Sequence, residues 1–163
     1  MIRRLATTLA AATLAAALIP ATAAATPLDP ITCHGAYVDA SYNIHNYLNA
    51  PMSSGTDRLT GNWCTNGSVA WATAVSAVEV YHSGTLGPMQ LTSSGSTTAY
   101  GDLRFYANWK RPITCPIPPY VDASVTVHEM ILVSMGGSII GYDVYGYDYD
   151  PTCMYSQVWQ SAP

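Results

Sequence analysis

Hydrophobic and polar residues alternate along two stretches of the chain, 37–48 and 120–133. With one exception in each stretch, every second position carries an apolar or aromatic side chain, namely Val38, Ala40, Tyr42, Ile44 and Leu48 in the first stretch and Val121, Ala123, Val125, Val127, Ile131 and Val133 in the second. The side chains of a strand point alternately to its two faces. The pattern therefore predicts two half-buried antiparallel strands, each with one polar face.

The same two stretches share a sequence motif. Pro-Ile-Thr-Cys at 30–33 returns at 112–115, and Tyr-Val-Asp-Ala-Ser at 37–41 returns at 120–124. A histidine follows each serine after four places. We interpret this as an internal partial duplication with copies 30–111 and 112–163. The equivalent polar positions are Tyr37, Asp39, Ser41 and His45 in the first copy and Tyr120, Asp122, Ser124 and His128 in the second.

Further strand signals lie at 68–82, 103–109, 138–149 and 157–160. The alanines of 68–82 would suit a helix, but its valines and Trp71 favour a strand. Residues 93–98 are predicted to form a polar turn. Several short strands joined by Gly, Pro, Ser and Asn turns predict an all-β fold, a two-sheet antiparallel sandwich or a barrel-like variant of it, in which both copies share one core.

The first 25 residues predict a secretory signal peptide. Arg3 and Arg4 precede an apolar run over 5–19, and small residues before position 26 suit cleavage after Ala25. The run is shorter than the roughly 20 residues that a membrane-spanning helix needs, and no second long apolar run follows. The alanine-rich composition is typical of a bacterial leader. We therefore expect a secreted protein without a transmembrane segment and with a single domain, 26–163.

All four cysteines fall in this expected domain. An even count in an oxidising compartment predicts two disulfides, for which three pairings are possible. The duplication favours Cys33–Cys64 and Cys115–Cys153, because each copy then closes its own loop. Each loop would contribute on the order of 3–4 kcal/mol in the chain-entropy model. Wide cysteine spacings without a CxxC pair argue against a zinc site.

The balance of charge limits the partners. Residues 26–163 carry four basic and ten acidic side chains, a formal charge of −6. Nucleic-acid binding and anionic membranes are disfavoured, because both require clustered Lys and Arg. No motif implies a cofactor.

The repeated Asp, Ser and His positions contain the residue types of a hydrolase triad. Within one strand, Asp39 and His45 would lie roughly 20 Å apart, whereas a triad requires hydrogen-bond contact. Across the copies, Asp39 could approach His128 if the two strands paired about a pseudo-twofold axis. No nucleophile elbow or oxyanion loop is visible, and the histidines (His34, His45, His82 and His128) lack HxH or HExxH spacing. We therefore expect the polar face of a sheet, with no catalytic residues and no metal site.

The stretch 142–150 concentrates tyrosines and aspartates. A sugar-binding platform would use tyrosines for stacking and aspartates as acceptors, and the candidate residues are Tyr142, Asp143, Tyr145, Tyr147 and Asp148. Calcium binding through Asp143, Asp148 and Asp150 is an alternative, although the spacing departs from an EF-hand loop. Twelve tyrosines and four tryptophans against one phenylalanine also favour a binding surface.

These patterns predict a secreted, non-catalytic binding protein whose partner is an extracellular polysaccharide, the cell envelope or a protein. One alternative is a small disulfide-stapled protease inhibitor or toxin-like effector that presents a loop at Lys110-Arg111-Pro112. Another is a hydrolase or metalloprotein that uses the paired Asp and His faces.

Overall fold

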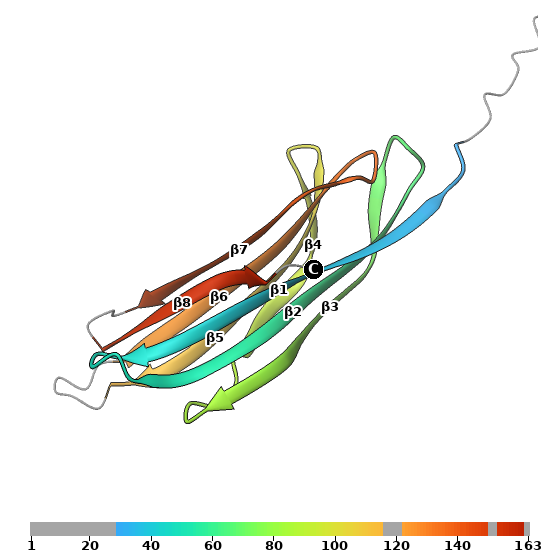
Figure 1. The fold of residues 1–163 in the computed structure, drawn as a ribbon. Coiled ribbons are helices and arrows are strands. Elements are labelled where there is room, and N and C mark those ends of the chain that lie inside the picture. Colours follow the sequence, from blue (N-terminus) through green and yellow to red (C-terminus); the bar gives the residue numbers. More distant parts are fainter. Residues whose placement is uncertain (1–28, 116–121, 150–152, 162–163) are drawn as a thin grey trace, which may run out of the picture.

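The chain folds into two stacked β-sheets. A computed structural model describes residues 29–115, 122–149 and 153–161 (Figure 1). Its strands, in chain order, are β1 (Thr32–Asn46), β2 (Pro51–Thr65), β3 (Ala70–Gly84), β4 (Gln90–Ala99), β5 (Asp102–Thr114), β6 (Asp122–Ser134), β7 (Ile139–Tyr149) and β8 (Met154–Ser161). The expected signal peptide, Tyr120 and Val121 lie outside the described residues.

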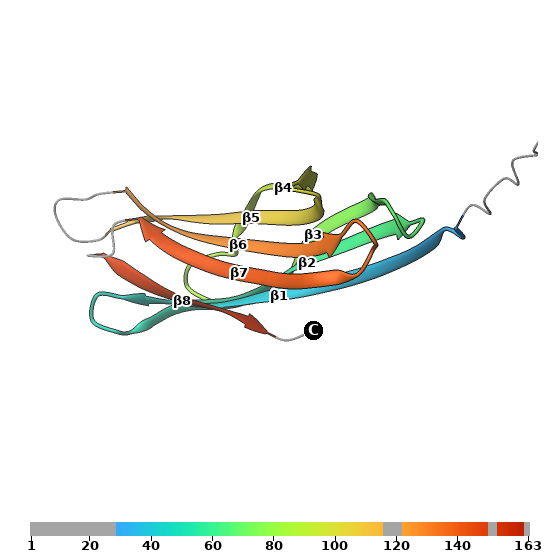
Figure 2. The ribbon, with the colours of Figure 1, turned by 90° about the horizontal axis from the view of Figure 1, so that it is seen from above.

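The strands form two antiparallel four-stranded sheets. The first sheet has the order β3-β2-β1-β8 and the second the order β4-β5-β6-β7. They stack face to face, with β1 against β6 and β2 against β5 (Figure 2). The predicted two-sheet sandwich is confirmed. The described part of the chain contains no helix long and apolar enough to cross a membrane.

The core lies between the central strands. The inward-pointing residues of β1 and β6 are fully buried, as the alternation predicted: Val38, Ala40, Tyr42 and Ile44 in β1 and Ala123, Val125, Val127, Ile131 and Val133 in β6. Each large apolar side chain contributes about 1.5–3 kcal/mol on burial. Leu48 is the exception, because it follows the end of β1 and is exposed. The ring of Phe105 packs onto Gly61, where a Cβ would lie 2.6 Å from the ring.

Both predicted disulfides are confirmed. Cys33 and Cys64 are directly opposed in the β1–β2 ladder, so this bond joins neighbours within the first sheet. Cys115 follows β5 and bonds to Cys153, which precedes β8. Since β5 and β8 belong to different sheets, the second bond ties the two layers together.

Several local predictions meet different outcomes. The strand expected at 68–82 is confirmed as β3, but the turn expected at 93–98 is wrong, because these residues lie inside β4. That strand is a sheet edge rich in Ser, Thr and Gly, so it lacks an apolar alternation. The sequence analysis assigned no strand to 51–65, which forms β2. Its inward positions include Gly55, Asp57 and Gly61, which give no hydrophobic signal.

The loop expected at Lys110-Arg111-Pro112 is also wrong. These residues belong to β5 and pair with β6, and Lys110 also pairs with β4 on the other side. Arg111 donates from Nη1 to the carbonyl of Pro88 at 3.3 Å, so its side chain serves the fold. A protease inhibitor that presents this segment as a loop therefore lacks its structural basis.

Candidate functional site

The tyrosine-rich stretch forms β7, an edge strand of the second sheet. Alternation along the strand divides the candidate residues between two faces. Asp143, Tyr145 and Tyr147 are exposed on the outer face, whereas Tyr142 and Asp148 lie on the opposite side and are partly buried. Asp148 accepts hydrogen bonds from the backbone N (2.7 Å) and Oγ (2.5 Å) of Ser156, and so links β7 to β8.

Two of these tyrosines stack on a histidine of the duplicated motif. His128 of β6 lies directly opposite Tyr145 in the ladder. Its ring centroid is 4.7 Å from that of Tyr145, with 20° between the planes, and 5.5 Å from that of Tyr147, with 19°. Such pairs contribute about 0.5–1.5 kcal/mol beyond their buried area. Tyr145 and Tyr147 nevertheless remain 47% and 55% exposed, so they can contact a ligand. We call this outer face of the second sheet the tyrosine face.

Hydrogen bonds from the neighbouring strands hold His128 in place. Asn108 of β5 donates from Nδ2 to the hydroxyl of Ser93 in β4 at 2.8 Å, and its Oδ1 contacts Nδ1 of His128. Because Oδ1 is an acceptor, the histidine proton lies on Nδ1, which leaves Nε2 as an acceptor. Burial lowers the pKa of His128 and thereby favours the neutral ring. The support for the tyrosines therefore extends across four strands.

A hollow of about 240 Å³ lies beside this stack. Its lining comes from β4, β5, β6 and β7 and consists of Thr97, Arg104, Tyr106, Asn108, His128, Glu129, Met130 and Tyr145. Tyr106 reaches over Gly95, where a Cβ would lie 3.0 Å from its hydroxyl, so the glycine makes room for the ring. A hydroxyl, an amide, a guanidinium and an aromatic ring thus surround one small cavity. This combination suits a polar ligand with one flat apolar face.

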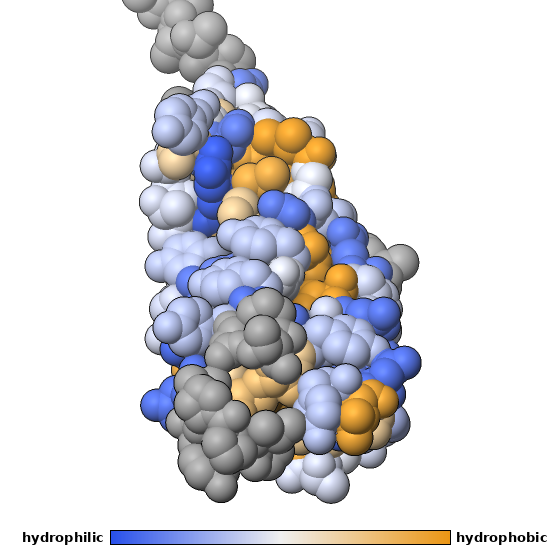
Figure 3. All heavy atoms as spheres, turned by 90° about the vertical axis from the view of Figure 1, so that its left-hand side faces the viewer, coloured by the Kyte–Doolittle hydropathy of each residue, from blue (hydrophilic) through white to orange (hydrophobic). Residues whose placement is uncertain are grey.

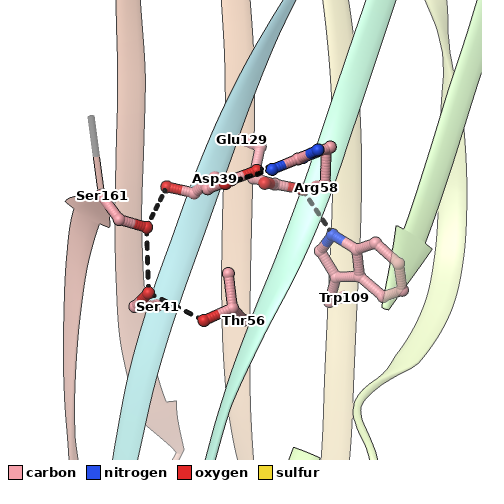
Figure 4. A network of polar contacts seen from close by, with 7 residues as sticks. All are labelled: Asp39, Ser41, Thr56, Arg58, Trp109, Glu129 and Ser161. Atoms are coloured by element: carbon pink, nitrogen blue, oxygen red, sulfur yellow. Dashed lines mark hydrogen bonds and ion pairs between the residues drawn. The ribbon is translucent and has the colours of Figure 1, made fainter. Parts of the chain in front are cut away.

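The outer face of the first sheet carries the other copy of the motif (Figure 4). Asp39 accepts two hydrogen bonds from Arg58, at 2.6 and 2.8 Å, and Arg58 lies 4.2 Å above the ring of Tyr37. Ser41 hydrogen-bonds with Thr56 and Ser161, both at 2.9 Å. The polar groups of this copy therefore bond to one another.

His45 completes that copy by stacking on Tyr155 of β8. Their ring centroids are 4.8 Å apart, with 10° between the planes. The Tyr155 hydroxyl donates to Asn49 Oδ1, so Tyr155 is held by this hydrogen bond as well as by the stack on His45. Each duplicated histidine thus stacks on a tyrosine of the adjacent edge strand.

The two Asp and His faces do not meet. β1 and β6 belong to different sheets and contact each other through their inward side chains, so His45 and His128 lie on opposite outer faces. Asp122 is exposed at the start of β6, far from the Asp39–Arg58 pair. The cross-copy approach of Asp39 to His128 considered for a hydrolase is therefore absent.

Metal ligation finds no cluster either. Within residues 29–115, 122–149 and 153–161, no group of three or more His, Cys, Asp or Glu side chains could hold a metal ion. Asp143 and Asp148 lie on opposite faces of β7, and Asp150 of the calcium hypothesis is outside the described residues.

Two buried carboxyl groups escaped the sequence analysis. Asp57 of β2 and Glu129 of β6 are 0% and 1% exposed and point into the core from opposite sheets. Trp109 donates from Nε1 to Glu129 Oε2 at 2.7 Å (Figure 4), while Glu129 Oε1 and both Asp57 oxygens have no hydrogen-bond partner among the described residues. The one available signal was the place of Glu129 in the apolar alternation of β6.

Burial shifts the protonation of both groups. It raises the pKa of Asp57 to about 8, with smaller contributions from the charges of Glu129 and Glu79. It also raises the pKa of Glu129 to about 7, against the hydrogen bond from Trp109. A pair of carboxyls that holds protons near neutral pH is a feature of many active sites, but these two are sealed from solvent.

The surface of the molecule is mixed in polarity. Figure 3 shows the side that lies on the left in Figure 1, where hydrophobic groups outside the grey atoms form patches separated by hydrophilic ones. A second hollow, of about 520 Å³, lies at one end of the sandwich beside Trp63 and His34. Trp63 of β2 donates from Nε1 to the carbonyl of Gly137 at 2.9 Å, so this bond joins the first sheet to the turn between β6 and β7.

Comparison of the chain with protein-family models, with curated proteins and with solved structures finds no match.

Proposed function

We propose that this protein is a secreted, non-catalytic binding protein and that its ligand is an extracellular polysaccharide bound on the tyrosine face. One observation carries the proposal: Tyr145 and Tyr147 stay half-exposed while both stack on His128. A sugar ring has one face of C–H groups and a rim of hydroxyls. Fixed aromatic rings bind the C–H face at a low entropic cost, because few side-chain torsions remain to be ordered.

The polar groups beside the stack complement the hydroxyl rim. The hollow offers the Nε2 acceptor of His128, the hydroxyls of Tyr106 and Thr97, and the guanidinium of Arg104. These side chains come from strands of one sheet, whose ladders fix their spacing. A site on strands is more rigid than a site on loops, which favours recognition of a repeating polymer.

A non-catalytic role is favoured by the bonding of the candidate catalytic groups. His128 uses Nδ1 to contact Asn108, and Asp39 is held by Arg58. Asp57 and Glu129, whose pKa values would suit acid–base chemistry, are buried between the two sheets. Their side chains are at most 1% exposed, so a substrate at the surface would not contact them.

Retention on a panel of insoluble polysaccharides, followed by calorimetry with the retained one, tests the proposal. Tyr145→Ala and Tyr147→Ala should each weaken binding by at least about tenfold, as expected for aromatic anchors. Tyr155→Ala is the matched control, because it removes the equivalent stack from the first sheet. The proposal fails if no polysaccharide is retained, or if Tyr155→Ala weakens binding as much as the other two variants.

A further inference from the structure

Arg104 is a cation that forms no ion pair with a carboxylate among the described residues. It lies on the outer face of β5 and lines the hollow, with its guanidinium carbon 5.4 Å from the centre of the Tyr100 ring. Its Nε is buried and has no hydrogen-bond partner among the described residues. In that part of the chain the ion pair between Arg58 and Asp39 stands alone, so Arg104 forms none.

Arg58 shows what Arg104 lacks. The guanidinium of Arg58 donates from Nε and Nη2 to both oxygens of Asp39, which is the two-point geometry that arginine and carboxylate favour. Arg104 lines a hollow instead, with no carboxylate of the described residues in an ion pair with it. A ligand carboxylate in the hollow would give the guanidinium the ion-pair partner that the described residues do not provide.

The acidic residues of the tyrosine face leave this position open. Asp102 is two residues away on the same face of β5 and forms no ion pair with Arg104. Asp143 of β7 is in register with Met130 of β6 and Tyr106 of β5, not with Arg104. Two strand spacings, roughly 10 Å, separate Asp143 from β5. Lys110, on the same face of β5, is exposed beyond the hollow.

We infer that the hollow beside Tyr145 binds a carboxylate-bearing sugar, a hexuronic acid unit of the polysaccharide, through the guanidinium of Arg104. This inference rests on the proposed function and names the class of sugar. The sugar face would stack on Tyr145, its carboxylate would accept from Arg104, and a ring hydroxyl would donate to Nε2 of His128. The formal charge of residues 26–163 is negative, so recognition depends on this short contact rather than on long-range attraction.

Binding to three polymers separates the contributions. Polygalacturonate, its fully methyl-esterified form and poly-glutamate are titrated into the intact secreted protein. The acid form should bind at least about tenfold tighter than the ester, since a hydrogen bond between two charged groups exceeds one to a neutral group by that order. Poly-glutamate has the charge without the sugar and should not bind.

Three variants assign the preference to Arg104. Arg104→Gln should abolish the preference, so that this variant binds the acid form no more tightly than it binds the ester. Arg104→Lys, which keeps the charge but loses the fork, should retain only part of the preference. Lys110→Gln is the matched control, because it removes a cation of the same face outside the hollow and should leave the preference intact.

The outcomes separate the inference from the proposed function. Equal binding of acid and ester, or an Arg104→Gln variant that keeps its preference, overturns the inference; if Tyr145→Ala still abolishes binding, the proposed function stands. Tight binding of poly-glutamate overturns it too, because charge alone would then suffice. If neither these polymers nor any other polysaccharide binds, both fail.

Discussion

The two outer faces of the sandwich carry the same motif in different surroundings. In both, a duplicated histidine stacks on a tyrosine of the adjacent edge strand, His45 on Tyr155 and His128 on Tyr145. The first face adds Arg58 and Asn49, which bond to Asp39 and Tyr155. The motif there is satisfied within the protein.

The tyrosine face instead leaves side chains that we propose contact a ligand. It adds a second stacked ring, Tyr147, together with a hollow and the guanidinium of Arg104, which forms no ion pair with the described residues. The comparison shows that the repeated histidines form the same stack on both faces. The neighbouring residues determine whether the polar groups around the stack bond within the protein or remain open to the proposed ligand.

The largest expected effect is on the stability of the whole sandwich and comes from Asp57 and Glu129, which lie in the core between the two sheets. Burial raises the pKa of Asp57 from 3.8 to about 8 and that of Glu129 from 4.5 to about 7. Between about pH 4 and pH 8 the folded state retains protons that the unfolded state releases. The free energy of unfolding therefore falls by several kcal/mol as the pH rises through this window. Urea unfolding at a series of pH values measures it.

Variants of the pair test that assignment. The charges of Asp39 on β1 and Glu79 on β3 also act on the two acids, and Trp109 of β5 donates a hydrogen bond to Glu129. Asp57→Asn should reduce the pH dependence and raise stability at pH 8, because only Glu129 then still ionises in the core. A wild-type protein whose stability rises between pH 5 and pH 8 would contradict the buried pair.

The next effect separates the two faces. The double variant Tyr145→Ala/Tyr147→Ala should lose about 2–4 kcal/mol of binding free energy to the retained polysaccharide, while Tyr155→Ala should lose none. Thermal unfolding of each variant serves as the control for folding. An equal loss in both would mean that the faces do not differ in function.

A smaller effect should follow from releasing His128. Asn108→Ala removes its hydrogen-bond partner and should weaken binding by about 0.5–1.5 kcal/mol, the usual net value of such a bond. It should also change the pH titration of His128, which NMR can follow. An unchanged His128 titration together with unchanged affinity would show that Asn108 does not position the ring.

The smallest effect belongs to the satisfied face. Asp39→Asn breaks the ion pair with Arg58, but a partly exposed pair contributes no more than about 1 kcal/mol to stability. Polysaccharide affinity should be unchanged. Calorimetry and urea unfolding at low and high salt check both statements, and a loss of affinity here would move the site to the first sheet.

The sequence predicted what alternation and cysteine count can reveal. The buried faces of β1 and β6 follow from a period of two, and both disulfides follow from the duplication. β2 and β4 were missed because glycine, serine and threonine replace the apolar positions that would signal a strand.

The candidate site was predictable only in part. Tyr145 and Tyr147 were visible on one face of a tyrosine-rich strand, but the pattern could not say that this face points to solvent. The roles of Asn108 and Arg104 depend on which strands become neighbours, and this adjacency is a property of the sheet order. A local sequence pattern does not contain it.

The most direct test of the difference between the faces is an NMR titration of the wild-type protein with a soluble fragment of the retained polysaccharide. The imidazole signals of His45 and His128 report on the two stacks within one molecule. We predict that the His128 signals shift in a saturable manner while those of His45 stay in place. A saturable shift of His45 with His128 unchanged would contradict the account.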